Sequence, residues 1–213
     1  MLISKMTFSG ESAFKEIFAG EYALHQAVWD LFADSPDRRR DFIYRMECVG
    51  KLPLVYAVSS RVPRDLKGLW HIETKEYAPS IESGIKIGFN VRVNPTVKRE
   101  GKRHDVVMDA KYQARGKNVG ENAALQDLVA ESCEKWLNKR SQENGFNMAK
   151  FRADGYRQIW FDKAKSGATV RFSTVDLSGV LEVVDVKIFT EMLFYGLGPE
   201  KGFGCGLMLV RKL

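Results

Sequence analysis

The order of predicted strands and helices is the feature that most constrains how this 213-residue chain folds. Apolar runs typical of strands cover residues 2–8, 41–49, 52–63 and 70–79, whereas apolar positions in residues 20–32 recur at helical spacing. A brief helical or irregular piece separates the last two strands. The sequence order is therefore strand, helix, strand, strand, weak helix, strand, which is the ferredoxin-like βαββαβ order.

The second half of the chain repeats this order without a close residue-level repeat. Its predicted elements are a strand at 84–95, a helix at 121–140, strands at 155–161 and 168–185, a helix at 185–196 and a final strand. We expect an α+β protein of two tandem ferredoxin-like (RRM-like) βαββαβ domains. Residues 1–83 form the first predicted domain and residues 84–213 the second.

A basic segment interrupts the second predicted domain. Residues 98–117 hold seven Lys or Arg and three Asp or Glu, and they carry +4 of the chain's net charge of +6. Their weak periodicity predicts an inserted loop, either solvated or in contact with RNA. An overall basic charge favours a polyanionic partner, and leaves RNA, DNA and anionic membranes as candidates.

The composition gives little support for a metal site or for a membrane-spanning segment. The three cysteines, Cys48, Cys133 and Cys205, are far apart and form no C-x-x-C pair or Cys/His cluster, so we expect no zinc site. An odd, sparse cysteine content suits a reducing compartment and predicts a cytoplasmic protein. No run approaches 18 apolar residues, so we expect no membrane-spanning segment.

The predicted helix at residues 20–32 carries the candidate chemistry. Its apolar stripe comprises Leu24, Val28 and Leu31. Tyr22, His25 and Trp29 share an adjoining face at spacings of three and four residues. The first turn of a helix suits a phosphate, and a histidine with a pKa of about 6.5 can exchange protons near neutrality. A packed or solvent-facing histidine beside an aromatic ring fits the same pattern.

Two basic turns are candidate RNA contacts. Arg38, Arg39 and Arg40 form the densest positive run, directly after the first helix. Lys163 and Lys165 lie in the turn at 162–167, where a basic hairpin tip suits an RNA groove or a row of phosphates. The alternative interpretation of both basic runs is a solvated surface that does not bind RNA. We predict Arg38, Arg39, Lys163 and Lys165 as RNA contacts, together with Arg171 from the following strand.

A glycine-rich stretch follows the last predicted helix. Its candidate RNA-contacting residues are Gly198, Lys201, Gly202, Gly204 and Gly206. A Rossmann phosphate loop follows a strand and precedes a helix, and a P-loop needs Gly-Lys-Ser/Thr, so neither nucleotide-binding pattern matches. Glycines let backbone N–H groups approach a ligand closely, which suits a nucleic-acid backbone. A tight structural connection is the alternative interpretation.

Together these motifs resemble a known family over essentially the whole chain. They are GLGPEKGFGCGL at 196–207, NVRVNP at 90–95, the Y-x-x-H of Tyr22 and His25, and the WDLF and DSPD stretches that follow it. The chain resembles the CasE-type CRISPR repeat endoribonucleases of type I-E systems. It departs from that pattern in the basic insertion at 98–120 and at Val91 and Val93, where we expect Leu and Ala.

The resemblance implies two ferredoxin-like domains that bind the stem-loop of each CRISPR repeat. It implies cleavage of the precursor at the 3′ base of the hairpin, with no metal or cofactor, and retention of the product among the other subunits of the type I-E surveillance complex. The implied catalytic residues are Tyr22 and His25. Metal-free RNA cleavage needs a base for the attacking 2′-hydroxyl, an acid for the leaving 5′-oxygen and positive charge at the phosphate. It gives a 2′,3′-cyclic phosphate and a 5′-hydroxyl.

Two other functions fit the sequence. One is a hairpin-RNA-binding subunit that does not cleave RNA, since paired ferredoxin-like domains are a common RNA platform. The other is a basic protein that binds nucleic acid without sequence preference, which predicts a steep dependence of binding on salt. The sequence does not assign the acid and base roles between Tyr22 and His25.

Overall fold

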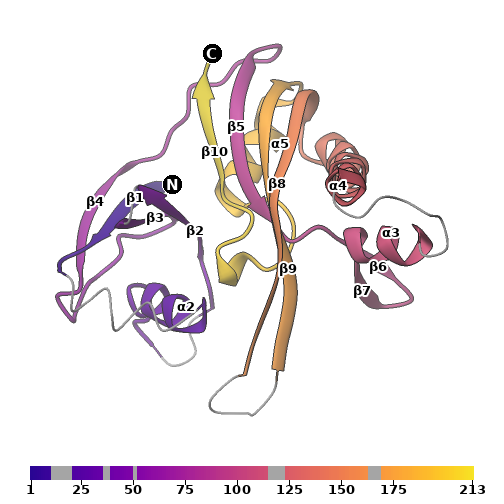
Figure 1. The fold of residues 1–213 in the computed structure, drawn as a ribbon. Helices are drawn as coiled ribbons and strands as arrows, with labels where there is room; N and C mark the ends of the chain where they lie inside the picture. Colours follow the sequence, from indigo (N-terminus) through magenta and orange to yellow (C-terminus); the bar gives the residue numbers. More distant parts are fainter. Residues whose placement is uncertain (11–20, 36–38, 50–51, 115–122, 163–168) are drawn as a thin grey trace.

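The computed structural model describes the whole chain except residues 11–20, 36–38, 50–51, 115–122 and 163–168. Two four-stranded antiparallel sheets form its frame (Figure 1). The first sheet contains β1 (Leu2–Phe8), β2 (Phe42–Val49), β3 (Leu52–Ser59) and β4 (Trp70–Glu76). The second sheet contains β5 (Lys86–Val93), β8 (Phe146–Asp162), β9 (Thr169–Val183) and β10 (Met208–Lys212).

Both sheets have the strand order of a ferredoxin-like fold. The first sheet is ordered β2-β3-β1-β4 and the second β10-β5-β9-β8, so in each the first and third strands of the βαββαβ pattern lie in the centre. Helix α2 (Glu21–Asp30) packs on the first sheet, and α4 (Ala123–Glu143) and α5 (Val186–Tyr195) belong to the second. The predicted α+β class with two ferredoxin-like units is confirmed, whereas the boundary between residues 83 and 84 stays a prediction.

Helix α2 buries the face that its sequence predicts. Leu24 and Val28 pack on the first sheet against apolar side chains of all four strands. Leu31 and Phe32 are also buried, in a turn after the helix ends at Asp30. This packing leaves Tyr22 and His25 on the neighbouring, half-buried face. The apolar stripe therefore fixes the direction in which the candidate catalytic residues point.

The weak second helix of the first half does not form. Residues 60–69 between β3 and β4 are irregular, which was the alternative that the sequence allowed. The Arg61 guanidinium organises this segment: it donates to Asp41 at 2.8 Å, to Asp34 at 2.7 Å and to the carbonyl of Phe32. One arginine of this segment thus ties it to the turn after α2 and to the start of β2.

The expectation of a loop in the basic segment is wrong for its described residues. They form a hairpin, β6 (Thr96–Arg99) and β7 (Lys102–Asp105), followed by helix α3 (Val106–Ala114). The turn places Glu100 and Gly101 at φ of 48° and 79°, and Asp105 caps the helix by accepting from the amides of Val107 and Met108. Elements of four, four and nine residues are too short to give a clear hydrophobic period.

Strand β8 starts at Phe146, earlier than the predicted strand at 155. With β9 it forms a two-stranded ribbon that extends well beyond the second sheet (Figure 1). Register shifts at Met148/Lys150 and Asp154/Arg157 interrupt the pairing, and such irregularities bend a ribbon. The extended part approaches the start of α2, because Phe161 on β8 lies 5.4 Å from Tyr22 between ring centroids.

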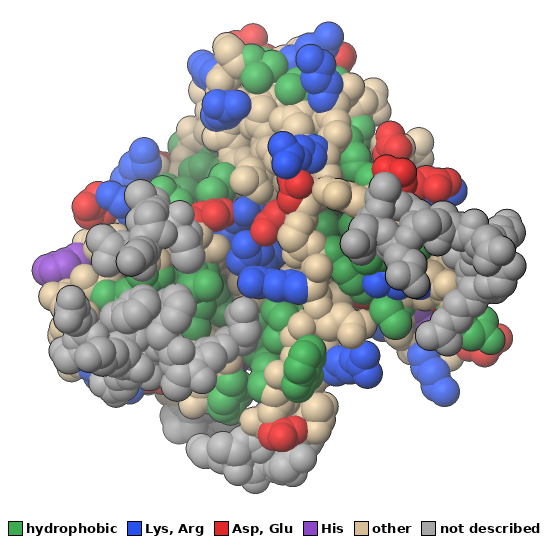
Figure 2. Space-filling model, in the orientation of Figure 1, with side chains coloured by type: hydrophobic (Ala, Val, Ile, Leu, Met, Phe, Trp, Pro, Cys, Tyr) green, Lys and Arg blue, Asp and Glu red, His purple; other side chains and the backbone are tan. Residues whose placement is uncertain are grey.

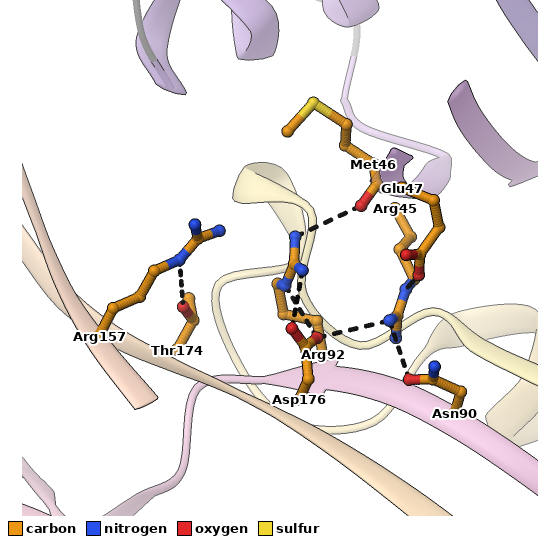
Figure 3. Close-up of polar contacts among 8 residues, drawn as sticks. All are labelled: Arg45, Met46, Glu47, Asn90, Arg92, Arg157, Thr174 and Asp176. Carbon is orange, nitrogen blue, oxygen red and sulfur yellow. Dashed lines mark hydrogen bonds and ion pairs between the residues drawn. The ribbon is translucent and has the colours of Figure 1, made fainter. Parts of the chain in front are cut away.

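A buried polar network joins the two sheets (Figure 3). Arg45 on β2 donates to Glu47 on its own strand, to Asn90 on β5 at 2.9 Å and to Asp176 on β9 at 3.4 Å. Arg92 on β5 binds the same Asp176 carboxylate through Nε at 3.0 Å and Nη2 at 2.8 Å. Figure 2 shows Lys and Arg beside Asp and Glu in the middle of this face, where the sheets meet.

An apolar cluster continues the junction. Ile43 and Val58 of the first sheet pack with Leu207, which follows the glycine-rich stretch. The stretch thus runs between the two sheets, with η1 (Lys201–Phe203), a single 3₁₀ turn, at its centre (Figure 1). In the described part of the chain, no helix combines the length and apolar character needed to cross a membrane.

Candidate active site

The candidate active site forms where α2, the glycine-rich stretch and the β8–β9 ribbon meet. Nδ1 of His25 lies 2.5 Å from the carbonyl oxygen of Gly202 in η1. A carbonyl only accepts hydrogen bonds, so this contact puts the hydrogen of a neutral imidazole on Nδ1 and the lone pair on Nε2. The histidine therefore has a fixed ring orientation and a defined nitrogen for proton exchange.

Aromatic rings surround His25. The ring of Phe203 lies 4.7 Å from the imidazole, and Tyr22 and Trp29 each lie 6.1 Å away, all measured between centroids. Phe203 in turn lies 5.3 Å from Phe161 on β8 and from Phe172 on β9. These contacts hold three separate segments of the chain around one imidazole.

Tyr22 and His25 are close together, as the helical spacing predicts. The hydroxyl of Tyr22 accepts a hydrogen bond of 3.1 Å from the Gln26 side chain one turn later. A phenol hydroxyl, which both donates and accepts, is suited to positioning a reacting group by hydrogen bonds. His25 is suited to give or take the proton.

Two cations line Gly202 and its neighbours. A Cβ atom at position 202 would lie 2.7 Å from Nη1 of Arg40 and 3.6 Å from Cε1 of His25. Lys201 donates to the carbonyl of Tyr195 at 2.6 Å. Burial and the nearby charge of Arg40 lower the pKa of Lys201, and burial lowers the pKa of Arg40, against the opposing effects of Tyr44 and Glu200.

The glycine-rich stretch is packed against protein at most of its glycines. Gly198, with φ of 76°, faces the ring of Trp136, and Gly204, with φ of 77°, faces Tyr44 on β2. Gly206 has φ of 93°, and its amide donates to the carbonyl of Arg92 at 2.7 Å. Three of these glycines are thus required by the conformation of the stretch, and their contact with RNA stays a prediction.

Two of the other predicted RNA contacts, Arg39 and Arg171, are among the described residues. Arg39 is exposed beside the site, and Arg171 is exposed on β9, where it donates to Gln158 at 3.1 Å. Arg38, Lys163 and Lys165 lie outside the described residues. The structure does not test any of these RNA contacts.

Sequence reasoning named Arg40 only as part of the basic run at 38–40, and it did not single out Phe203. Arg40 precedes β2, and strand alternation places it on the side of Phe42 and Tyr44, which pack with α2. That alternation is a signal the sequence already carries. Phe203 is the one aromatic residue within the glycine-rich stretch at 196–207, but nothing local shows that its ring contacts His25. Only the fold brings positions 25 and 203 together.

Comparisons with known proteins identify the family. The chain matches the family described as CRISPR associated protein over residues 1–212. It is 27% identical to the CRISPR system Cascade subunit CasE of Escherichia coli K12, covering 90% of this chain and 92% of that protein. It is 23% identical to the CRISPR-associated endoribonuclease Cse3 of Thermus thermophilus, covering 99% of each chain.

Solved structures share the fold. A structure of CRISPR endoribonuclease Cse3 bound to a 19-nucleotide RNA superposes with a TM-score of 0.74 at 21% identity, covering 99% of this chain and 100% of that one. The CRISPR-associated protein Cas6e of Escherichia coli K-12 gives a TM-score of 0.66 at 23% identity, with full coverage of both chains. Sequence, motifs and fold agree, and the chain belongs to the CasE/Cse3 (Cas6e) family of type I-E CRISPR endoribonucleases.

Proposed function

We propose that this protein is a metal-independent endoribonuclease that binds the stem-loop of a CRISPR repeat and cuts precursor CRISPR RNA at the 3′ base of the hairpin. The observation that carries this proposal is the His25 imidazole, bonded to Gly202 and enclosed by rings from α2, η1 and the β8–β9 ribbon. An imidazole of fixed orientation beside a second polar aromatic suits general acid–base chemistry on a phosphodiester.

The reaction needs only groups that proteins supply. The 2′-oxygen next to the cut attacks the adjacent phosphorus, and its proton passes to a base. The bond from phosphorus to the 5′-oxygen breaks, and that oxygen takes a proton from an acid. The products are a 2′,3′-cyclic phosphate and a 5′-hydroxyl. His25 serves one of the two proton transfers, and Tyr22 holds the reacting groups in line, where positioning contributes strongly to the rate.

RNA binding in this proposal extends along the face that surrounds the site. Arg38 and Arg39 contact phosphates near the cut, the stretch Gly198–Gly206 follows the backbone, and the ribbon with Lys163, Lys165 and Arg171 enters the stem. RNA binding itself is supported by two structures of Cse3 solved with RNA, one of them described as representing a pre-cleavage complex.

We also propose that the protein keeps its product and joins the type I-E surveillance complex. Two relatives support membership of the complex: CasE is named as a Cascade subunit, and a chain of a CRISPR RNA-guided surveillance complex shares the fold with a TM-score of 0.68. A precursor transcript is a cytoplasmic substrate, so the proposal also locates the protein in the cytoplasm.

The test is cleavage of the host's own repeat hairpin in EDTA by wild type, His25→Ala and His71→Ala. His71 is exposed on β4 and serves as the matched histidine control. Loss of proton transfer by His25 predicts a rate that is about 10²–10⁴-fold lower, with binding of the uncut hairpin retained. His71→Ala is expected to cut as wild type does.

Each other outcome removes a specific part of the proposal. A chelator that stops wild-type cleavage would refute metal independence. Cleavage by His25→Ala at the wild-type rate would remove the histidine from the mechanism. A wild type that binds the hairpin tightly without cutting it would leave the non-catalytic binding subunit as the function, and equal binding of a scrambled stem would indicate non-specific binding.

A further inference from the structure

Arg40 stands apart from the arginines beside it. Its Nη1 atom and Cε1 of His25 approach the same point, the position that a Cβ on Gly202 would occupy, at 2.7 Å and 3.6 Å. Arg39 and Arg40 both keep much of their side chains exposed, but neighbouring residues of an extended chain point in opposite directions. The guanidinium end of one arginine of the basic run therefore lies at the candidate catalytic histidine.

The surroundings of Arg40 concentrate positive charge. Lys201 follows Glu200 in the turn that carries Gly202, and burial together with the Arg40 charge lowers the pKa of Lys201. Glu200 acts on Arg40 electrostatically, but its carboxylate also accepts from Arg103 of the β6–β7 hairpin at 2.9 Å. A partly buried guanidinium is stabilised when an anion arrives, because burial disfavours its charged form.

Gly202 leaves space for the Arg40 guanidinium beside the His25 imidazole. It has no positive φ, so its backbone conformation does not require glycine. Any side chain at 202 would instead fall on the guanidinium of Arg40 and the edge of the imidazole. The absence of a side chain is what leaves room for the Arg40 guanidinium at this position, and the imidazole edge lies at ordinary contact distance.

We propose that Arg40 forms an anion site for the phosphodiester that is cut, and that it is a catalytic residue. The inference rests on the proposed ribonuclease function. Arg40 donates to the two non-bridging oxygens while the 2′-oxygen bonds to phosphorus and the 5′-oxygen leaves. It stays protonated throughout, and the proton transfers belong to the acid and the base. A planar guanidinium matches two phosphate oxygens at once, which an ammonium does not.

The experiment measures two quantities on the same RNA. Single-turnover cleavage at saturating protein gives the rate constant of the chemical step, and a hairpin with a 2′-deoxy nucleotide at the cut gives the Kd without cleavage. The variants are Arg40→Gln, Arg40→Lys and Arg39→Gln. Arg64→Gln is the matched control, because Arg64 is exposed and its amide contacts Leu31 at the opposite end of α2 from His25.

We expect Arg40→Gln to lower the saturated rate about 100- to 1,000-fold, as loss of a donor to a developing oxyanion does elsewhere. Its Kd for the deoxy hairpin should rise less than about tenfold, the usual scale of one lost phosphate contact. Arg40→Lys should recover part of the rate because it restores the charge without the planar fork. Arg39→Gln should raise the Kd while the saturated rate stays within a few-fold of Arg64→Gln.

A second variant covers the case in which Arg40→Gln does not fold. Gly202→Ala adds one methyl group where the Arg40 guanidinium lies, and the flexible arginine can move aside without strain in the backbone. Displacing a catalytic group by about 1 Å costs up to about 100-fold in rate, and we expect a loss of that order at unchanged thermal stability.

The possible results separate this inference from the proposed function. A wild type that cuts, with Arg40→Gln cutting as fast as Arg64→Gln, overturns the role of Arg40 alone. Equal losses in rate and in affinity for Arg40→Gln make Arg40 a binding residue and overturn its catalytic role. A wild type that cuts no repeat RNA overturns both the ribonuclease function and the role of Arg40 within it.

Discussion

Asp176→Ala is the perturbation for which the structure gives the clearest magnitude. Its carboxylate accepts from Nε and Nη2 of Arg92 and from Nη2 of Arg45, so the change removes the acceptor shared by two arginines. The Arg45 side chain is 1% exposed, and Arg92 is 16% exposed. Water can therefore replace the lost carboxylate at Arg45 only in part, and the protein keeps an undercompensated charge at the junction of its sheets.

Breaking a buried ion pair by removing one partner costs about 3–5 kcal/mol. The Asp176 side chain is 31% exposed, and Glu47 still accepts from Arg45, so we expect the low end, about 3 kcal/mol. In a chain of this size each 1 kcal/mol lowers Tm by about 2–4 °C, which predicts a drop of about 6–12 °C.

Urea unfolding, followed by circular dichroism and by tryptophan fluorescence, measures the free energy of unfolding. Glu131→Ala is the control, because it breaks an i,i+4 pair with Lys135 on α4 that is exposed to solvent, and exposed pairs contribute little to stability. A loss for Asp176→Ala no greater than that of the control would refute the reasoning that the network is a buried junction. Both probes should shift together, because the network joins the first sheet to the second.

Three further predictions concern stability. Arg45→Met should cost less than Asp176→Ala in the same urea assay, since it removes a buried charge whose Nη1 has no hydrogen-bond partner among the described residues. Gly204→Ala should lower the free energy of unfolding by about 1–2 kcal/mol, because φ of 77° strains any residue with a Cβ. Burial raises the pKa of Asp41, but hydrogen bonds from Arg61 and Ser60 outweigh it and lower the pKa overall. A lowered carboxyl pKa stabilises the folded protein at pH values above the pKa of the unfolded state, and this stabilisation is lost as pH falls through the pKa of the folded state. Urea titrations should therefore show that Asp41→Asn is less stable than wild type at pH 6, and that the difference vanishes in acid.

Most elements of the fold could be predicted because their signals are local. The apolar stripe of α2 and the alternation in β1, β2 and β5 follow directly from side-chain periods of 3.6 and 2. The prediction of a loop for the basic segment is wrong because the segment lacks such a local period. The structure of β6, β7 and α3 depends on a two-residue turn and on the cap at Asp105 rather than on any period long enough to recognise.

The candidate site could be predicted only where one helix carries it. Tyr22 and His25 are three residues apart, so helical geometry alone brings them together. Gly202 is 177 positions from His25 in the chain, and no local pattern predicts their hydrogen bond. The sequence also offers three adjacent arginines at 38–40, and their composition does not distinguish the one that approaches the imidazole.

Local sequence patterns were sufficient to set the order of strands and helices, the apolar face of α2 and the pair of polar aromatic side chains at its start. Tertiary packing decided which distant groups contact that pair of side chains. The glycine-rich stretch reaches them because it runs between the two packed sheets. Tertiary packing also set the pairing of Arg45 with Asp176, which are 131 positions apart. Local periodicity reports which side of an element is buried, whereas contacts across a domain junction depend on how two finished sheets fit together.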